Sequence, residues 1–321
     1  MFKILISDAT YQSIISREEQ KSTTNRSYLY KLLKQQPVQI LTASENEEYK
    51  AHPENVMKNP SAVYILDITG AEALTIQRQY GVICLSGEHP NISPLIDVND
   101  IHTPNEGEKL ARGWDSVLDS IETLPSNALL LTDRYLFASR NKDLGDGLAN
   151  VHNILIELLP KEFSGGDYHI TVVFCKDKTH NSYKFGEITT KLNNIAQQMG
   201  RPYPIMMEVF GISKGSDIYE NMHPRRIISN YYLVEATHKL AAFNRNLGTA
   251  QQLLIPLALF TEASLNGTTT SPLDSINQTI GNLHDFYEDI LHRKDEKIDY
   301  LYAFNGKMME KCMGIRNRLL K

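Results

Sequence analysis

Three residues near the C-terminal end of the sequence have types and spacing that could support attack on a phosphate. His292, Lys294 and Asp299 follow the pattern H-x-K-x4-D within the stretch LHRKDEKIDY. In such a pattern the imidazole attacks phosphorus and the lysine neutralises the phosphate oxygens. Positions i and i+2 lie side by side on a β-strand, but on a helix they diverge by roughly 200°. The alternating charges of this stretch favour a solvated helix face, so we expect no active site here.

A second stretch has the same spacing and strand character. His223, Arg225 and Asn230 follow the pattern H-x-R-x4-N within MHPRRIISNYY. On a strand, His223 and Arg225 share a face. Arginine keeps the positive charge of a lysine and can bind a phosphate through two parallel hydrogen bonds. Asn230 cannot accept a proton as a carboxylate does, so this pattern favours phosphate binding over catalysis.

The sequence around this motif resembles a known domain. Together with the strand and helix order before it, the segment of residues 127–262 is similar to the degenerate phospholipase D-like domain at the C-terminus of some MIT-domain proteins of membrane trafficking, whose strand also reads His-x-Arg. The resemblance implies a phospholipase D-like fold that binds a phosphoinositide or a membrane without hydrolysing it. It also implies that a competent active site would need two histidines, so a single half-domain would have to dimerise.

Two further cations are candidates for the same site. Arg134 follows the apolar run ALLLTD, with Asp133 immediately before it, and Lys239 follows the expected hairpin. We expect Arg134 and Lys239 to join the three motif residues in binding a ligand. The alternative for Asp133 and Arg134 is a local salt bridge or turn contact, and the alternative for Lys239 is a solvated side chain.

Three acidic residues suggest a different chemistry. Asp8 ends the first apolar run, Asp67 lies near the end of a later one, and Glu88 follows the fourth. Carboxylates at the carboxyl ends of parallel strands lie where open α/β sheets bind ligands, and this trio could hold Mg2+ or Mn2+ for phosphodiester cleavage. The alternative is that these acids cap helices or begin turns.

Strands and helices alternate in the first unit, residues 1–124. Four apolar runs rich in β-branched residues are separated by helical stretches, which predicts a mostly parallel sheet with covering helices. In outline this unit is receiver-like or PIN-like. The runs span residues 2–7, 38–43, 62–68 and 81–86.

Two further units follow. Residues 125–265 have the order β-α-β-α-β-β-β, expected for a phospholipase D-like half-domain. In residues 272–321 Tyr287, Leu301 and Ile315 belong to a seven-residue repeat, which predicts a long helix that packs on the parent domain or forms a coiled coil. The predicted fold class is therefore α/β: an N-terminal mostly parallel sheet domain, a phospholipase D-like half-domain and a C-terminal long helix.

Composition restricts the partners and the location of the protein. A net charge of −5 gives no general attraction to nucleic acid or anionic lipid, so nucleic acid could bind only through a local patch. No apolar run reaches the ~20 residues of a membrane span. The cysteines lie far apart and have no metal-ligand spacing with the histidines. We therefore expect reduced thiols in a cytoplasmic protein without a metal or other cofactor.

These patterns together predict a non-catalytic binding or assembly protein. It would hold a phosphate-bearing ligand or a protein partner, form a homodimer supported by its C-terminal helix, and could serve in a bacterial multi-gene system such as phage defence. The alternative function is a metal-dependent nuclease or phosphodiesterase that uses the acids of the first unit.

Overall fold

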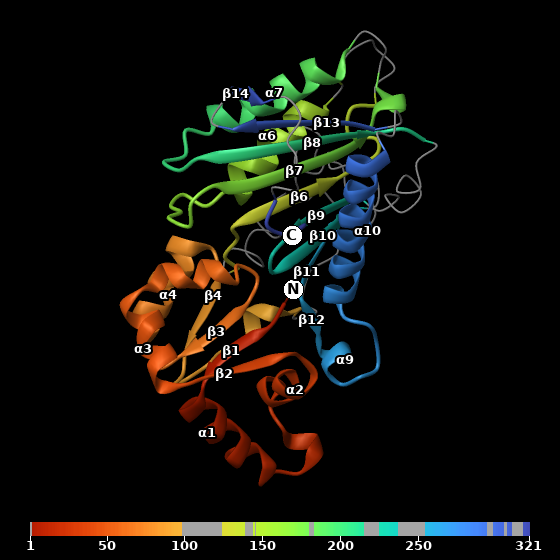
Figure 1. The fold of residues 1–321 in the computed structure, drawn as a ribbon. Coiled ribbons are helices and arrows are strands. Elements are labelled where there is room, and N and C mark those ends of the chain that lie inside the picture. Colours follow the sequence, from red (N-terminus) through yellow and green to blue (C-terminus); the bar gives the residue numbers. More distant parts are fainter. Residues whose placement is uncertain are drawn as a thin grey trace, which may run out of the picture.

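Two β-sheets, one above the other in Figure 1, form the framework of the protein. The computed structural model describes residues 2–97, 124–138, 144, 146–179, 183–214, 225–236, 254–293, 298–304, 307–309 and 317–321. Within these residues the chain forms a parallel sheet of four strands, a mixed sheet of eight strands and a short two-stranded sheet. The predicted α/β fold class is therefore confirmed.

The smaller sheet has the order β2-β1-β3-β4, and all of its strands are parallel. Each of the four predicted apolar runs contains one of these strands. Thr42 and Thr69 begin the helices after β2 and β3, each in a capping box with the glutamate three residues later. The elements are β1 (Ile4–Ser7), α1 (Asp8–Glu19), α2 (Tyr28–Gln35), β2 (Val38–Leu41), α3 (Ala43–Ala51), β3 (Val63–Leu66), α4 (Gly70–Tyr80) and β4 (Ile83–Ser86).

The two faces of the smaller sheet bury different residues because side chains alternate along a strand. On one face Ile6 of β1 belongs to a core with Ile14 of α1 and Leu32 of α2. On the other face Leu5 belongs to a separate core with Ile76 of α4. The sheet is thus covered on both sides, as its nearly continuous apolar strands predict.

Glu18, near the end of α1, is a buried carboxylate that fixes the start of α2. Its Oε1 accepts a hydrogen bond from Lys21 Nζ at 2.7 Å, and its Oε2 accepts one from the Ser27 backbone N–H at 2.7 Å. Burial by itself would raise the pKa of Glu18. The hydrogen bonds from Lys21 and Ser27, together with the charge of Lys21, outweigh burial and hold that pKa below its usual value.

Replacing Glu18 with glutamine is expected to lower the free energy of unfolding at about pH 7. The variant should also lose less stability than the wild type when the pH is lowered. Because the folded pKa is depressed, the carboxylate stabilises the protein above its unfolded pKa, and this contribution is lost as pH falls through the folded pKa. Urea unfolding at about pH 7 and about pH 3 measures the effect. An equal loss of stability on acidification in the variant and the wild type would contradict this prediction.

The larger sheet has the order β11-β10-β9-β6-β7-β8-β13-β14. Strands β6, β7 and β8 are parallel, and the other neighbouring pairs are antiparallel. Strands β9 and β10 are joined by a tight turn at Asn230 and Tyr231. The elements are β6 (Ala128–Thr132), α6 (Gly147–Leu158), β7 (Tyr168–Cys175), α7 (Phe185–Gln198), β8 (Ile205–Ile212), β9 (Arg225–Ser229), β10 (Tyr232–Ala236), β11 (Leu254–Ala258), α10 (Pro272–Arg293), β13 (Ile298–Phe304) and β14 (Lys307–Met309).

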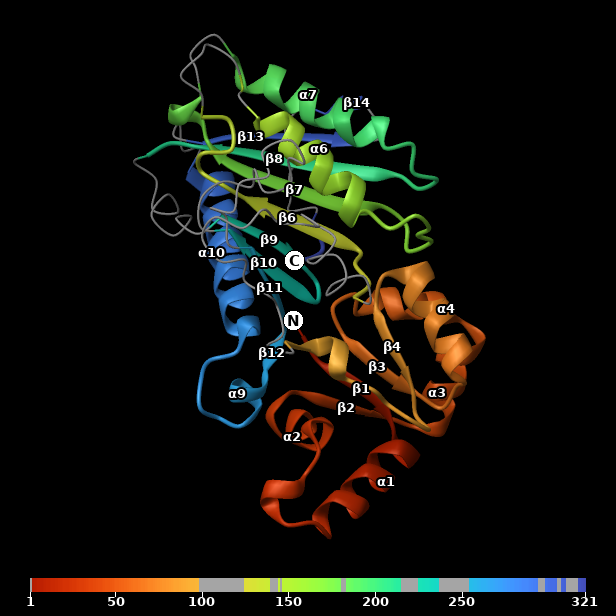
Figure 2. The same ribbon diagram turned by 180° about the vertical axis from the view of Figure 1, so that it is seen from behind.

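Helices cover both faces of the larger sheet (Figures 1 and 2). Helices α6 and α7 lie on one face, where a Cβ added to Gly211 of β8 would come within 2.9 Å of the Phe185 ring of α7. On the opposite face, Arg226 Nη1 of β9 donates a hydrogen bond to Thr279 Oγ1 of α10 at 2.6 Å. Neighbouring residues of β9 therefore face different environments, and Arg225 points away from α10.

The predicted long C-terminal helix is wrong at residues 298–304 and 307–309. Helix α10 is described as far as Arg293, and these later residues form β13, which pairs antiparallel with β8, and β14. The sequence of β13, IDYLYAF, is rich in residues that favour strands, and β8 offers it a free edge, so sheet pairing prevails over the seven-residue period. His292 lies on the helix and Asp299 on β13, so the H-x-K-x4-D pattern is divided between two elements.

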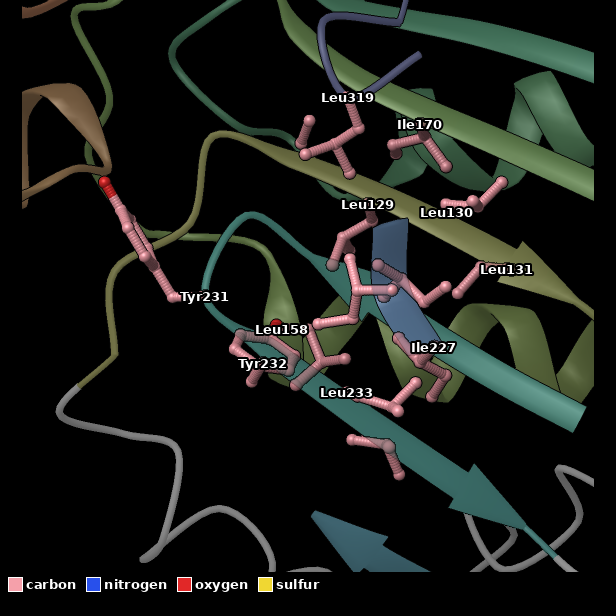
Figure 3. Packing of buried hydrophobic residues seen from close by; sticks show 14 of the residues in the cluster. Leu129, Leu130, Leu131, Leu158, Ile170, Ile227, Tyr231, Tyr232, Leu233 and Leu319 are labelled. Atoms are coloured by element: carbon pink, nitrogen blue, oxygen red, sulfur yellow. The ribbon is translucent and has the colours of Figure 1, made fainter. Parts of the chain in front are cut away.

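The two sheets share one hydrophobic core. Strand β5 (Ile96–Asp97) pairs with β12 (Phe260–Thr261), which precedes α9 (Glu262–Leu265). The rings of Phe2 and Phe260 meet edge to face with centroids 5.6 Å apart. The core that contains Ile6 of the smaller sheet continues into the side chains of the larger sheet, part of which Figure 3 shows.

A hydrogen-bonded latch joins the turn between β9 and β10 to the smaller sheet. Asn127 Nδ2 donates to the carbonyl oxygens of Pro60 and Gly81 at 2.7 and 2.9 Å, and Asn230 Nδ2 donates to the same two oxygens at 3.0 and 2.9 Å. Asn230 Oδ1 accepts a hydrogen bond from the Asn127 backbone N–H at 3.2 Å. In Figure 3 the Tyr231 hydroxyl points toward the smaller sheet, where it donates to the carbonyl oxygen of Ala62.

Gly81 is required at this contact for two reasons. It ends α4 with φ +61°, which L side chains rarely adopt, and a Cβ added to it would lie 2.2 Å from the carbonyl oxygen of Ser126. The close approach of the two sheets therefore depends on a residue without a side chain.

Residues 317–321 pack on the α10 face of the larger sheet. The fully buried Asn317 donates from its backbone N–H to Glu208 Oε2 at 3.1 Å and from Nδ2 to Thr171 Oγ1 at 2.9 Å. Thr171 Oγ1 itself donates to Glu208 Oε2 at 3.0 Å. The network gives the buried Glu208 carboxylate polar partners in the middle of the sheet.

Candidate anion-binding site

Charged side chains gather at one end of the central strands of the larger sheet, where β6 and β7 end and β9 begins. This end of the strands is called the sheet edge below. Because β6 and β7 are parallel, their carboxyl ends lie at the same edge. Strand β9 is antiparallel to β6 and pairs Arg226 with Thr132, which brings its first residue, Arg225, to that edge too. Open α/β sheets bind their ligands outside the carboxyl ends of their strands.

Asp133 and Tyr135 form the base of this site. The backbone N–H of Asp133 donates to the carbonyl oxygen of Val173 at 3.1 Å, which continues the pairing of β6 with β7 for one residue. Asp133 Oδ1 accepts a hydrogen bond from the Tyr135 backbone N–H at 2.8 Å. These bonds stabilise the turn after β6 and hold the half-buried Tyr135 ring at the edge of the sheet.

Three cations surround the ring of Tyr135. The guanidinium carbons of Arg134 and Arg225 lie 5.5 and 5.4 Å from the ring centroid, and Lys178 Nζ lies 5.2 Å from it. Lys178 belongs to the short 3-10 helix Lys176–Lys178 after β7. Cation–π contacts at such distances contribute roughly 0.5–2 kcal/mol each, depending on solvent exposure. The Tyr135 ring thus offsets part of the repulsion among the three cations.

One buried carboxylate balances part of this charge. Arg225 Nε lies 3.6 Å from Asp133 Oδ1, and the two side chains are 14% and 1% exposed. A buried carboxylate holds a neighbouring guanidinium in place because separating the two would leave a buried charge uncompensated, which is strongly destabilising. The pair therefore directs the Arg225 side chain toward Tyr135 and the sheet edge.

The predicted ligand-binding residues come together only in part. Arg134 and Arg225 meet at Tyr135, and Asp133 forms the salt bridge that the sequence offered as an alternative, although with Arg225. His223 and Lys239 lie outside the described residues.

The predicted binding role of Asn230 is wrong. It lies at the opposite end of β9 from Arg225, where both of its side-chain polar atoms are used in the latch to the smaller sheet. The five residues of β9 span roughly 16 Å, so Asn230 cannot reach a ligand held by Arg225.

The acids of the first unit do not form a metal site. Asp67 Oδ1 accepts hydrogen bonds from the hydroxyls of Ser7 and Thr10 at 2.7 and 2.9 Å, so it stabilises the start of α1. Asp8 is exposed in the first turn of α1, and Glu88 is exposed after β4. Across the residues that the structure describes, no three His, Cys, Asp or Glu side chains are grouped to hold a metal ion. Asp67 does not cap the helix that follows it either, because Thr69 is the N-cap of α4.

Two residues of the site were not recognised from the sequence. Tyr135 follows Arg134 directly, and Lys178 lies just beyond the strand HITVVFC. The sequence did hold a signal for Lys178. The expected order of elements includes the strand HITVVFC, and Lys178 lies just beyond its carboxyl end, where parallel strands place ligand-binding residues. Its contact with Tyr135 depends on the parallel pairing of β6 with β7.

No family model, curated protein or solved structure matched the chain. Among the helices of the described ranges, none has the length and apolar character needed to cross a membrane. The functional conclusion therefore depends on the geometry of the Tyr135 site.

Proposed function

We propose that the protein is a binding module that holds a phosphate-bearing ligand at the edge of its larger sheet, with Arg134, Arg225 and Lys178 as the cationic groups. The observation that carries the proposal is the convergence of these three side chains on the Tyr135 ring. Guanidinium groups bind phosphate oxygens through paired hydrogen bonds, and an ammonium adds a point charge.

Binding without turnover is the activity that these residues support. Guanidinium groups and a lysine ammonium stabilise an anion, whereas Asp133 is committed to Arg225 and to the backbone of Tyr135. The proposal agrees with the resemblance to a degenerate phospholipase D-like domain, in which a His-x-Arg strand binds its ligand. A protein partner would be bound through the same chemistry, by a phosphate group on its surface.

Two further expectations belong to this proposal: a homodimer and a cytoplasmic location. The dimer was predicted from the two histidines that a phospholipase D-like active site needs, with a long C-terminal helix as its support, but residues 298–304 and 307–309 of that helix form β13 and β14. A dimer would therefore not use a helical seam through these residues.

Inorganic phosphate is expected to bind the full chain with a Kd of about 1 mM or tighter, and binding should weaken as salt concentration rises. Isothermal titration calorimetry measures this directly. The matched variants are Lys178→Ala, which removes a cation of the site, and Lys191→Ala, which removes an exposed cation of α7. Absence of phosphate binding, or equal weakening by both variants, would overturn the proposal.

A further inference from the structure

A second group of cations lies on α1, on α2 and on the turn between them. In both ribbon views these two helices lie at the end of the protein away from the larger sheet, so this surface is separate from the site at Tyr135 (Figures 1 and 2). Five cations stand between residues 17 and 34 of the sequence, and we call them the α1–α2 patch: Arg17, Lys21, Arg26, Lys31 and Lys34.

Two carboxylates at the end of α1 balance part of the charge of the patch. Arg17 Nε and Lys21 Nζ lie 3.4 and 2.7 Å from the same oxygen, Glu18 Oε1. Lys34 Nζ lies 3.9 Å from Glu19 Oε1, and both of these side chains are exposed. Three cations thus share two carboxylates.

The other two cations of the patch have no salt bridge within the described ranges. The contact of Arg26 is with an aromatic ring, and Lys31 Nζ donates a hydrogen bond to Asn266 Oδ1 at 2.7 Å. Glu262 of α9 adjoins Tyr28, which is a third carboxylate at this surface. With that carboxylate included, the patch keeps an excess of positive charge in a protein whose net charge is −5.

Two tyrosine rings hold the cations of α2 in place. The Arg26 guanidinium carbon and Lys34 Nζ lie 5.0 and 5.4 Å from the centroid of the Tyr30 ring, and Lys31 Nζ lies 4.9 Å from the centroid of the Tyr28 ring. Such cation–π contacts restrict the side chains before any ligand arrives. Tyr30 is itself buried, so its ring cannot stack on a nucleobase.

The turn between the helices adds neutral hydrogen-bonding groups to this surface. Four exposed hydroxyl and amide side chains occupy consecutive positions, those of Ser22, Thr23, Thr24 and Asn25. Proteins contact the backbone of DNA through arginine and lysine together with serine, threonine and asparagine side chains. The patch and the turn therefore carry the types of side chain that bind phosphodiester groups.

We infer that the α1–α2 patch binds the phosphate backbone of a DNA duplex without reading its sequence. The cations are spread along α2, which is about 12 Å long, and along the end of α1, so they match a row of phosphates better than a single anion. A duplex carries one negative charge per about 1.7 Å of its axis. Binding of single strands commonly depends on aromatic rings that stack on bases, which the covered tyrosines do not offer. The inference goes beyond the proposed function, because it uses none of the residues at Tyr135.

Fluorescence anisotropy of a labelled DNA duplex of about 20 base pairs, titrated with the full chain, tests this inference. At about 50 mM salt the Kd is expected to be about 10 μM or tighter, and log K should fall with log salt concentration with a slope of about −3 to −5. Two duplexes of unrelated sequence should bind with affinities within about twofold of each other. A single strand of the same length and polyglutamate, which stands for an acidic protein, should bind more weakly.

Paired variants locate the binding on the patch. The double variant Lys31→Ala/Lys34→Ala is expected to weaken duplex binding about tenfold and to reduce the salt slope by about two. Lys31→Arg/Lys34→Arg keeps both charges and should stay within about twofold of the wild type. The matched control, Lys161→Ala/Lys191→Ala, removes two exposed lysines elsewhere and should also stay within about twofold.

Four results would overturn the inference: no binding of the duplex, equal losses in the two double alanine variants, a single strand that binds as tightly as the duplex, or polyglutamate that does so. The proposed function is tested separately, because the affinity for inorganic phosphate should be the same in Lys31→Ala/Lys34→Ala as in the wild type. The two proposals can therefore fail independently.

Discussion

Replacing Arg225 with alanine is expected to weaken the binding of inorganic phosphate by about 10-fold to 150-fold, since a hydrogen bond to a charged group contributes roughly 1.5–3 kcal/mol. The substitution removes one of the cations at Tyr135 and also leaves the buried Asp133 without its guanidinium partner. The Asp133 carboxylate, no longer offset by the charge of Arg225, would then repel the incoming anion. Arg225→Lys keeps the charge but not the paired hydrogen bonds, so it should recover only part of the affinity.

The neighbouring Arg226 provides the matched control. It lies on the opposite face of the same strand, where Nε donates to Glu235 Oε1 at 2.6 Å and Nη1 donates to Thr279 of α10. Arg226→Ala changes the net charge of the protein by the same amount and is expected to leave phosphate affinity within about twofold of the wild type. Equal losses in the two alanine variants would mean that net charge, and not the site at Tyr135, controls binding.

Replacing both asparagines of the latch is expected to destabilise the protein by more than the sum of the two single substitutions. Asn127 and Asn230 donate to the same two carbonyl oxygens, those of Pro60 and Gly81. Each single alanine variant leaves one donor on each oxygen and should cost about 1–3 kcal/mol, mainly through other lost contacts. The double variant leaves both oxygens without a side-chain donor, so a positive coupling of about 1 kcal/mol or more is expected.

Urea unfolding of the wild type, the two single variants and the double variant measures this coupling. Asn55→Ala is a suitable control, because Asn55 makes one exposed contact with Glu48, and it should change stability by less than about 0.5 kcal/mol. Strictly additive losses would contradict a shared role of the two asparagines. Phosphate affinity should be unchanged in the folded single variants, since the latch lies at the other end of β9 from Arg225.

The latch and the shared core couple the stability of the two sheets. The core that contains residues of α1 and α2 is continuous with the core of the larger sheet. The second core contains only residues of the smaller sheet and of the helices and loops that cover it. The two sheets therefore stabilise one another, although the sequence divides them into two successive units.

The sequence by itself determined the local elements, because their signals lie within a few neighbouring residues. The apolar runs predicted the four strands of the smaller sheet, and the T-x-x-E sequences at Thr42 and Thr69 set the starts of two helices. The alternation of strands and helices predicted the parallel central strands. The two-residue period of a strand also places Arg225 and Arg226 on opposite faces of the sheet.

Only the tertiary structure decided which distant residues meet. The free edge of β8 turned residues 298–304 into a strand where a seven-residue repeat predicted a helix. The smaller sheet recruited Asn230 into the latch, whereas its spacing from His223 had suggested a ligand contact. Tyr135 gathers Lys178 and Arg225 because parallel and antiparallel pairing with β6 brings the end of β7 and the start of β9 to one edge. The periodicity of a segment encodes the conformation of that segment. Contacts between distant segments depend instead on which strands lie next to one another in the sheet.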